Sequence, residues 1–127
     1  MYLLFDLSVK DRIRITVFDE TMVHEHDVEG VNRDLLVVLD TILKKEGCTP
    51  TEVKGCMVVV GAGGFTSTRL AVTVANAFGY ALGIPLLALT KDEAAHPEQY
   101  IGLLLQQPKG QYISATYSGE ANIGNKK

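Results

Sequence analysis

The first residues with the chemistry of an active site are Asp6 and Ser8, a carboxylate and a hydroxyl two positions apart at the end of an apolar run. Carboxylate oxygens are preferred ligands of Mg²⁺. The pair would therefore suit a phosphotransfer site in which Asp6 faces the metal and Ser8 supplies a hydroxyl. A polar residue that closes a strand at a turn gives the same pattern, so the sequence allows both interpretations.

A glycine-rich turn, Gly61-Ala-Gly-Gly64, joins an unbroken apolar run to a helical pattern. A strand, a glycine turn and a helix in succession present backbone amides to an anion, so Gly61, Gly63 and Gly64 could cradle a phosphate. Neither nucleotide motif is complete, because a dinucleotide fingerprint would need glycine at Thr66 and a Walker-type P-loop would end in Gly-Lys-Ser or Gly-Lys-Thr. We favour the simpler role of a tight strand-to-helix turn.

The remaining candidate metal ligands are two histidines and two cysteines. His24 and His26 alternate on one expected strand and so face the same side, which would offer two ligands. No third ligand accompanies them in the sequence, and a solvated strand face explains the pair equally well. Cys48 and Cys56 have the spacing of neither a redox pair nor a zinc site. We therefore predict no metal site and no catalytic nucleophile.

The candidate residues depend on a β-rich first part of the chain. Hydrophobic alternation and turn residues predict strands at Tyr2 to Leu7, Arg12 to Phe18 and Thr21 to Val28, which would form an antiparallel meander. A helix should follow from Arg33 to Glu46, with Asn32 as its N-cap. The α/β units come after this helix.

The second part of the chain should contain crossover units. The run Cys56 to Val60 lacks alternation and predicts a central strand, a helix should run from Thr66, Ser67 or Thr68 to Leu82, and Pro85 to Thr90 should be another strand. Lys91 to Ala95 would make one helical turn, and Tyr100 to Gln106 with Gln111 to Tyr117 would make a hairpin. The expected fold is an α/β mixed sheet with helices packed on it.

The helix after the glycine turn is the expected working surface. Arg69 is its only charged residue, and a helix that is apolar nearly all round must be buried nearly all round. Small residues along it would let a second backbone approach closely, unless they pack within the same chain. The predicted partner contact comprises this strip and the apolar arc of the first helix: Leu36, Leu39, Leu43, Arg69, Val72, Ala75, Asn76, Gly79 and Gly83.

Length and charge set the remaining expectations. The 127 residues fit one domain at 1–117 with a frayed tail at 118–127. A net charge of -3 gives no basic patch for nucleic acid. Asp6 interrupts the apolar start too early for a signal peptide, and no run approaches the length of a membrane span. We expect a cytoplasmic protein with no membrane contact.

Three segments carry a family resemblance: Met1-Tyr-Leu-Leu-Phe-Asp-Leu-Ser8, Gly61-Ala-Gly-Gly-Phe-Thr-Ser-Thr-Arg-Leu70 and Ala81-Leu-Gly-Ile-Pro-Leu-Leu-Ala-Leu-Thr90. In this order they are similar to the opening strand, the glycine segment and the strand that follows it in the bacterial TsaB (YeaZ-like) family. The resemblance implies an RNase H-like, actin-like ATPase (ASKHA) fold that has lost catalysis. Four positions depart from the family pattern: Leu7, Ala62, Gly64 and Ser67. Leu7 stands where the family has threonine and Gly64 where it has serine, so hydroxyls near a possible phosphate site are reduced.

The resemblance also implies a function. It indicates a non-catalytic adaptor that forms a homodimer and binds a TsaD-type enzyme in tRNA threonylcarbamoyladenosine synthesis, with a TsaE-type ATPase joining the assembly. No cofactor is then expected. One alternative is a minimal nucleotide-binding phosphotransfer or hydrolase domain that uses ATP and Mg²⁺ at Asp6, Ser8 and the Gly61 turn. Another is a homodimeric regulatory module with an unrelated partner.

Overall fold

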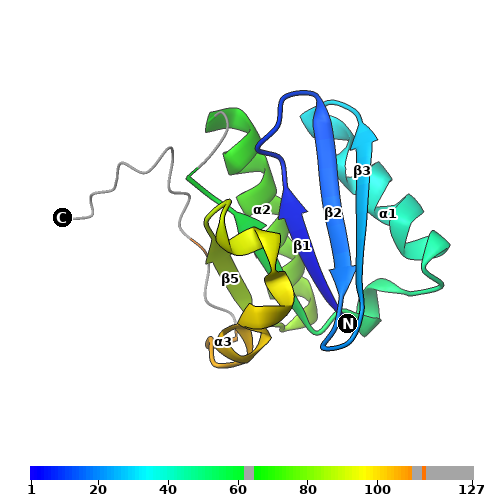
Figure 1. Ribbon diagram of the computed structural model, residues 1–127. Coiled ribbons are helices and arrows are strands. Elements are labelled where there is room, and N and C mark those ends of the chain that lie inside the picture. The colour runs from blue at the N-terminus through cyan, green and yellow to red at the C-terminus, as the bar shows by residue number, and fades with distance from the viewer. Residues whose placement is uncertain (62–64, 110–112, 114–127) are drawn as a thin grey trace.

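A five-stranded mixed sheet in the order β3-β2-β1-β4-β5 organises the chain (Figure 1). The computed structural model describes residues 1–61, 65–109 and 113. The antiparallel meander has β1 (Tyr2–Asp6) at the centre of the sheet, β2 (Arg12–Phe18) beside it and β3 (Val23–Glu29) at the edge. On the other side of β1, β4 (Gly55–Val59) and β5 (Leu86–Leu89) run parallel to it.

Helices cover both faces of this sheet. The long helices α1 (Leu35–Lys45) and α2 (Phe65–Leu82) lie behind it in Figure 1, and the short helix α3 (Ile101–Leu105) lies on the opposite face. Short 3-10 turns occupy Asn32–Asp34, Pro50–Glu52, Glu93–Ala95 and Pro97–Tyr100. The elements up to β5 confirm the predicted meander followed by crossover units, with small shifts at their ends.

Two hydrophobic clusters follow from the alternation of side chains along the strands. In β1, Leu3 and Phe5 face α1 and α2 and belong to the larger cluster. Tyr2 and Leu4 face the other way and pack with the cluster that contains Ile101 and Leu104 of α3. Because both faces of β1 and β4 are covered, every residue of these strands is buried.

The predicted hairpin strand at Tyr100 to Gln106 is wrong, because this segment is helical. Its buried side chains, Ile101 and Leu104, are three positions apart, which is helical spacing, and Pro97 occupies the first position of the preceding 3-10 turn. The second predicted strand, Gln111 to Tyr117, lies outside the described residues apart from Ile113, as does the tail at 118–127.

The predicted start of the first helix is also wrong. Asn32 opens a 3-10 turn, and α1 begins only at Leu35, after Asp34. The Asp34 carboxylate accepts a hydrogen bond from the backbone amide of Val31 at 3.1 Å, which stabilises the turn before the helix. Within residues 1–61 and 65–109, no helix has both the length and the hydropathy that a membrane crossing requires.

Candidate functional site

Asp6 ends β1 and accepts hydrogen bonds from two residues. The backbone amide and the hydroxyl of Ser8 donate to its Oδ1, at 2.9 and 2.5 Å. The Lys91 ammonium donates to Oδ2 at 2.6 Å and to the Ser8 hydroxyl oxygen at 2.8 Å. The three side chains therefore form a closed hydrogen-bonded cluster, which we call the Asp6 cluster.

The topology explains why these distant residues meet. Because β1, β4 and β5 are parallel, their carboxyl ends lie at one edge of the sheet. Lys91 follows β5 after a single intervening residue, Thr90, and so reaches this edge beside Asp6. Arg14 is the register partner of Asp6 on β2, and its Nη1 lies 3.9 Å from Oδ2 of Asp6.

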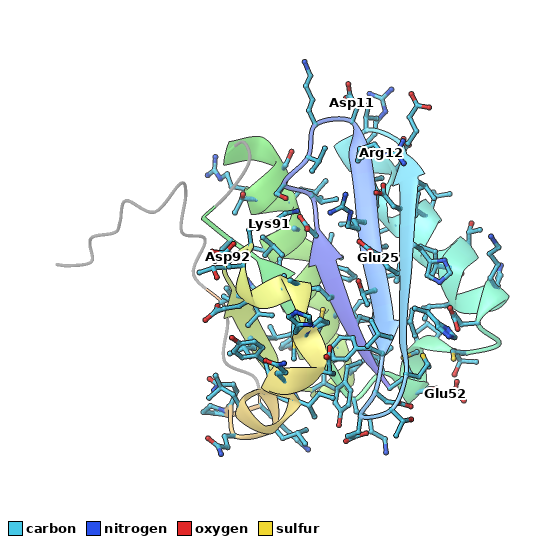
Figure 2. The ribbon with its side chains drawn as sticks, viewed as in Figure 1. Asp11, Arg12, Glu25, Glu52, Lys91 and Asp92 are labelled. Atoms are coloured by element: carbon cyan, nitrogen blue, oxygen red, sulfur yellow. The ribbon has the colours of Figure 1, made fainter. Side chains whose placement is uncertain are left out.

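Arg14 extends the charged cluster toward the edge strand β3. Its guanidinium forms ion pairs with Glu25 at 3.1 Å and with Asp27 at 3.0 Å. Burial lowers the pKa of the guanidinium, but Asp27, Asp6 and Glu25 outweigh this effect and raise it. Figure 2 labels Lys91 on one side of β1 and Glu25 on the other, so charged groups line both sides of this strand end.

The Asp6 carboxyl group stays ionised next to its lysine. Burial raises its pKa, but the hydrogen bonds from Lys91 and Ser8 outweigh burial and bring the pKa below its ordinary value. The phosphotransfer hypothesis places Mg²⁺ against this carboxylate, where the structure places the Lys91 ammonium. The residues present therefore do not fit a metal at Asp6, and no catalytic step through a metal follows from them.

A cavity of about 340 Å³ adjoins the Asp6 cluster. Charged residues line one part of it, and small apolar residues line another. The complete lining is Leu4, Asp6, Arg14, Thr16, Val23, Glu25, Lys91, Ala94, Ala95 and Pro97.

Gly61 lies at the same edge of the sheet, separated from the end of β4 at Val59 by a single residue, Val60. It has φ of +77°, a conformation that favours glycine and agrees with the start of a turn. Gly63 and Gly64 lie outside the described residues. The hypothesis that they cradle a phosphate stays a prediction.

Most of the predicted small-residue strip is buried inside the chain. Val72 and Ala75 face the sheet and pack in the larger hydrophobic cluster. A Cβ atom added to Gly79 would lie only 2.9 Å from Cδ1 of Leu86 in β5. The expectation that this strip is free for a second backbone is therefore wrong, because α2 uses its small residues to approach its own sheet.

The first helix shows the same division between buried and exposed positions. Leu39 and Leu43 are buried in the larger cluster, whereas Leu36 is 59% exposed and Val37 is 69% exposed. On α2, Tyr80 is 76% exposed, and Arg69 is also exposed. Of these predicted contact residues, Leu36 and Arg69 are therefore on the outer surface, whereas Leu39 and Leu43 are not.

The other two predicted contact residues lie along and after α2. Gly83 is exposed and ends the helix with φ of +65°. Asn76 is half-buried, and its side-chain amide donates to the carbonyl oxygen of Ile113 at 3.1 Å. Its Oδ1 accepts from the backbone amide of Ile113 at 2.8 Å. Asn76 therefore joins Ile113, 37 positions later in the chain, to α2.

His24 and His26 meet a carboxylate at the end of α1. Nε2 of His26 lies 2.7 Å from Glu46, and Nδ1 of His24 lies 3.1 Å from it. The contacts with His26 and His24 outweigh the burial of Glu46 and lower the pKa of its carboxyl group. Among the described residues, no group of three or more candidate ligands has the arrangement needed to hold a metal ion. The contacts tie edge strand β3 to α1.

Sequence reasoning missed Lys91 and Arg14 at this site. The signal for Lys91 was its position just after the last parallel strand, since the carboxyl ends of parallel strands share one edge. The signal for Arg14 was the meander itself, which places the second strand against Asp6. Thr16 also lines the cavity, but nothing in its residue type or position in the sequence indicates a place at this site.

A comparison with protein-family sequence models finds a match to residues in the middle and later parts of the chain. The family is described as TsaD: tRNA N6-adenosine threonylcarbamoyltransferase, and its model matches residues 29–116. The match covers more than half of the chain. No curated protein matches the chain at a significant level.

Solved structures with the same fold include YeaZ from Pseudomonas aeruginosa, with a TM-score of 0.65 and 24% sequence identity over 78% of this chain. A second structure has the same values and is described as an uncharacterized protein with similarity to peptidase YEAZ from Pseudomonas aeruginosa. This chain covers 50% of the length of each. The likeness confirms the predicted RNase H-like α/β fold.

Proposed function

Because the chain belongs to the TsaD family, tRNA N6-adenosine threonylcarbamoyltransferase, we propose that it acts in tRNA threonylcarbamoyladenosine modification as a non-catalytic adaptor. In this role it forms a homodimer and binds a TsaD-type catalytic subunit in the cytoplasm. A TsaE-type ATPase joins the assembly through that partner. Nucleotide, metal and chemistry belong to the partner subunits.

The observation that carries the non-catalytic role is the contact between Lys91 and Asp6. A catalytic carboxylate at the end of β1 would have to leave a position open for a metal ion. Here an ammonium group fills that position at 2.6 Å and is also hydrogen-bonded to Ser8. To bind Mg²⁺ at Asp6, the protein would have to break this ion pair and move the Lys91 ammonium away from the carboxylate.

The helical layer supports an interaction role. Leu36 and Val37 on α1 and Tyr80 on α2 are large apolar side chains that point away from the core. Exposed apolar residues rimmed by polar ones are common at protein interfaces. We place the partner contact on this outer surface, together with Arg69, Asn76 and Gly83, in place of the buried strip.

Light scattering on mixtures with the cognate TsaD-type subunit tests the proposal. We expect a complex at micromolar concentrations and a Leu36→Glu variant that binds at least about tenfold more weakly. Leu105→Glu is the matched control, because Leu105 is 53% exposed on a helix of the opposite sheet face. An absent complex, or equal weakening by both variants, would refute the proposed partner surface.

Calorimetry with ATP and Mg²⁺ distinguishes the adaptor from the nucleotide-binding alternative. The adaptor should give no saturable heat. Saturable heat that disappears in an Asp6→Ala variant would favour a nucleotide-binding enzyme. If light scattering shows a homodimer that does not bind the TsaD-type subunit, the result would favour a regulatory module with an unrelated partner.

A further inference from the structure

The cavity beside the Asp6 cluster has the size and lining of a small-ligand site. Its volume of about 340 Å³ falls at the lower end of the range for small-molecule pockets. The floor is the β1–β2 part of the sheet, and the segment after β5 forms one wall. In Figure 2, the labelled Lys91 and Glu25 lie on either side of the strand end that this cavity borders.

Thr16 is a buried residue whose side chain borders the cavity. The residue is 6% exposed and lines the cavity, on the same face of β2 as Arg14. Its hydroxyl makes no hydrogen bond to any residue that the structure describes. Among the described residues, no fully buried side-chain oxygen or nitrogen lacks a partner, so the Thr16 hydroxyl is open to the cavity and can bond to a molecule there.

Two cations in the lining also retain free donors. A lysine ammonium has three N–H groups, and Lys91 uses two of them on Asp6 and Ser8. The Nη1 group of Arg14 lies 3.9 Å from Asp6, too far for a hydrogen bond. Both nitrogens lie within 4 Å of the same Asp6 oxygen, so the two cations lie near each other at the Asp6 end of the cavity.

The negative charges of the lining restrict which ligand fits. A simple anion between Lys91 and Arg14 would face the Asp6 carboxylate without a compensating charge of its own. Glu25, which is exposed and bonded to Arg14 at 3.1 Å, adds a second carboxylate on the far wall. A ligand that carries both a positive and a negative group matches these alternating charges of the lining better than a ligand with only one sign of charge.

We propose that the cavity binds a zwitterionic α-amino acid, with its carboxylate between Lys91 and Arg14 and its ammonium group toward Glu25. The Thr16 hydroxyl bonds to the ligand carboxylate. Small apolar residues of the wall, Ala94, Ala95 and Pro97, leave room for a short side chain. This inference goes beyond the proposed adaptor function and does not depend on it.

Titration of the isotope-labelled full chain, followed by amide NMR shifts, tests the proposal. The probes are glycine, serine and leucine, with acetate and methylamine as ligands that each carry one charge. We expect saturable shifts at millimolar amino acid, confined to residues of the cavity, and no saturable shift with acetate or methylamine. Acetate binding as tightly as glycine, or no saturation with any amino acid, overturns the proposal.

Variants test the assigned contacts. Thr16→Val keeps the shape of the side chain and should weaken glycine binding about fivefold to tenfold. Glu25→Gln, on the exposed wall, should weaken it similarly and does not disturb the core. Thr73→Val changes an exposed threonine of α2 and is the matched control. Unchanged affinity in the folded Thr16→Val and Glu25→Gln proteins overturns the assignment.

Discussion

The ammonium nitrogen of Lys91 lies 2.6 Å from Oδ2 of Asp6, and this contact joins the segment after β5 to the last residue of β1. We expect Lys91→Met to lower the free energy of unfolding by about 1–3 kcal/mol at neutral pH, because the variant removes the cation that is hydrogen-bonded to a buried carboxylate. Urea denaturation of the wild type and the variant would measure this loss.

The same variant should change the response to acid. The pKa of Asp6 is depressed because Lys91 and Ser8 outweigh the effect of burial. A depressed carboxyl pKa contributes stability above the unfolded-state pKa and loses it as the pH falls through the folded-state pKa. The difference in the free energy of unfolding between the wild type and Lys91→Met should therefore shrink below about pH 4.

Lys44→Met is the control, because it removes an exposed ion pair with Asp40. It should change the free energy of unfolding by less than about 0.5 kcal/mol at any pH. A loss in Lys91→Met that does not depend on pH would contradict this account.

Local sequence patterns predicted most of the fold. The alternation of Ile13, Ile15 and Val17 identified β2, and the unbroken run at Cys56 identified a strand buried on both faces. The pattern failed at Ile101 to Leu105, where five residues are too few to show a helical period and consecutive leucines also suit a strand. Tertiary packing against β4 and β5 decides the structure of this segment.

The candidate site was less predictable, because it depends on which strand ends meet. Asp6 and Ser8 were recognisable from their residue types, but their partner Lys91 is 85 positions away. The sequence predicted that α2 would be buried nearly all round, but the structure buries only the face toward the sheet and leaves Arg69, Thr73 and Tyr80 exposed. Gly79 has no side chain and would allow another molecule to approach α2 closely, but in the structure Leu86 of the same chain takes this place.

Gly79 should tolerate even a methyl group poorly. In Gly79→Ala, the new Cβ would lie 2.9–3.0 Å from three atoms of Leu86, a buried side chain that must then move. We expect a loss of about 1–3 kcal/mol in the free energy of unfolding. Gly102→Ala, in α3, is the control, since nothing lies within 4 Å of its new Cβ. That variant should be neutral or more stable by up to about 1 kcal/mol, and similar destabilisation of both proteins would count against close packing at Gly79.

The two free cysteines should differ sharply in reactivity. Cys56 lies in the core, and burial raises the pKa of its thiol strongly. Cys48 is half-buried, and burial followed by the nearby Glu52 and Glu46 raises its pKa more moderately. Because the thiolate is the reactive form, iodoacetamide should label Cys48 slowly and Cys56 on the order of 100-fold more slowly. Peptide mass spectrometry would measure both rates, and equal rates are expected only in denaturant. Equal rates in the native protein would mean that β4 is open to solvent.

The Asn76 side chain should protect the backbone amide of Ile113 from hydrogen exchange. That amide donates to Oδ1 of Asn76 at 2.8 Å, and the Ile113 side chain packs against the larger hydrophobic cluster. Removing the acceptor in Asn76→Ala costs the hydrogen bond, so exchange at Ile113 should become roughly tenfold faster. Amide exchange followed by NMR measures this rate directly. Thr73→Ala, one turn earlier on the exposed side of α2, should leave the rate unchanged. If exchange at Ile113 is equally fast in the wild type and in Asn76→Ala, the hydrogen bond between Asn76 and Ile113 does not protect this amide in solution.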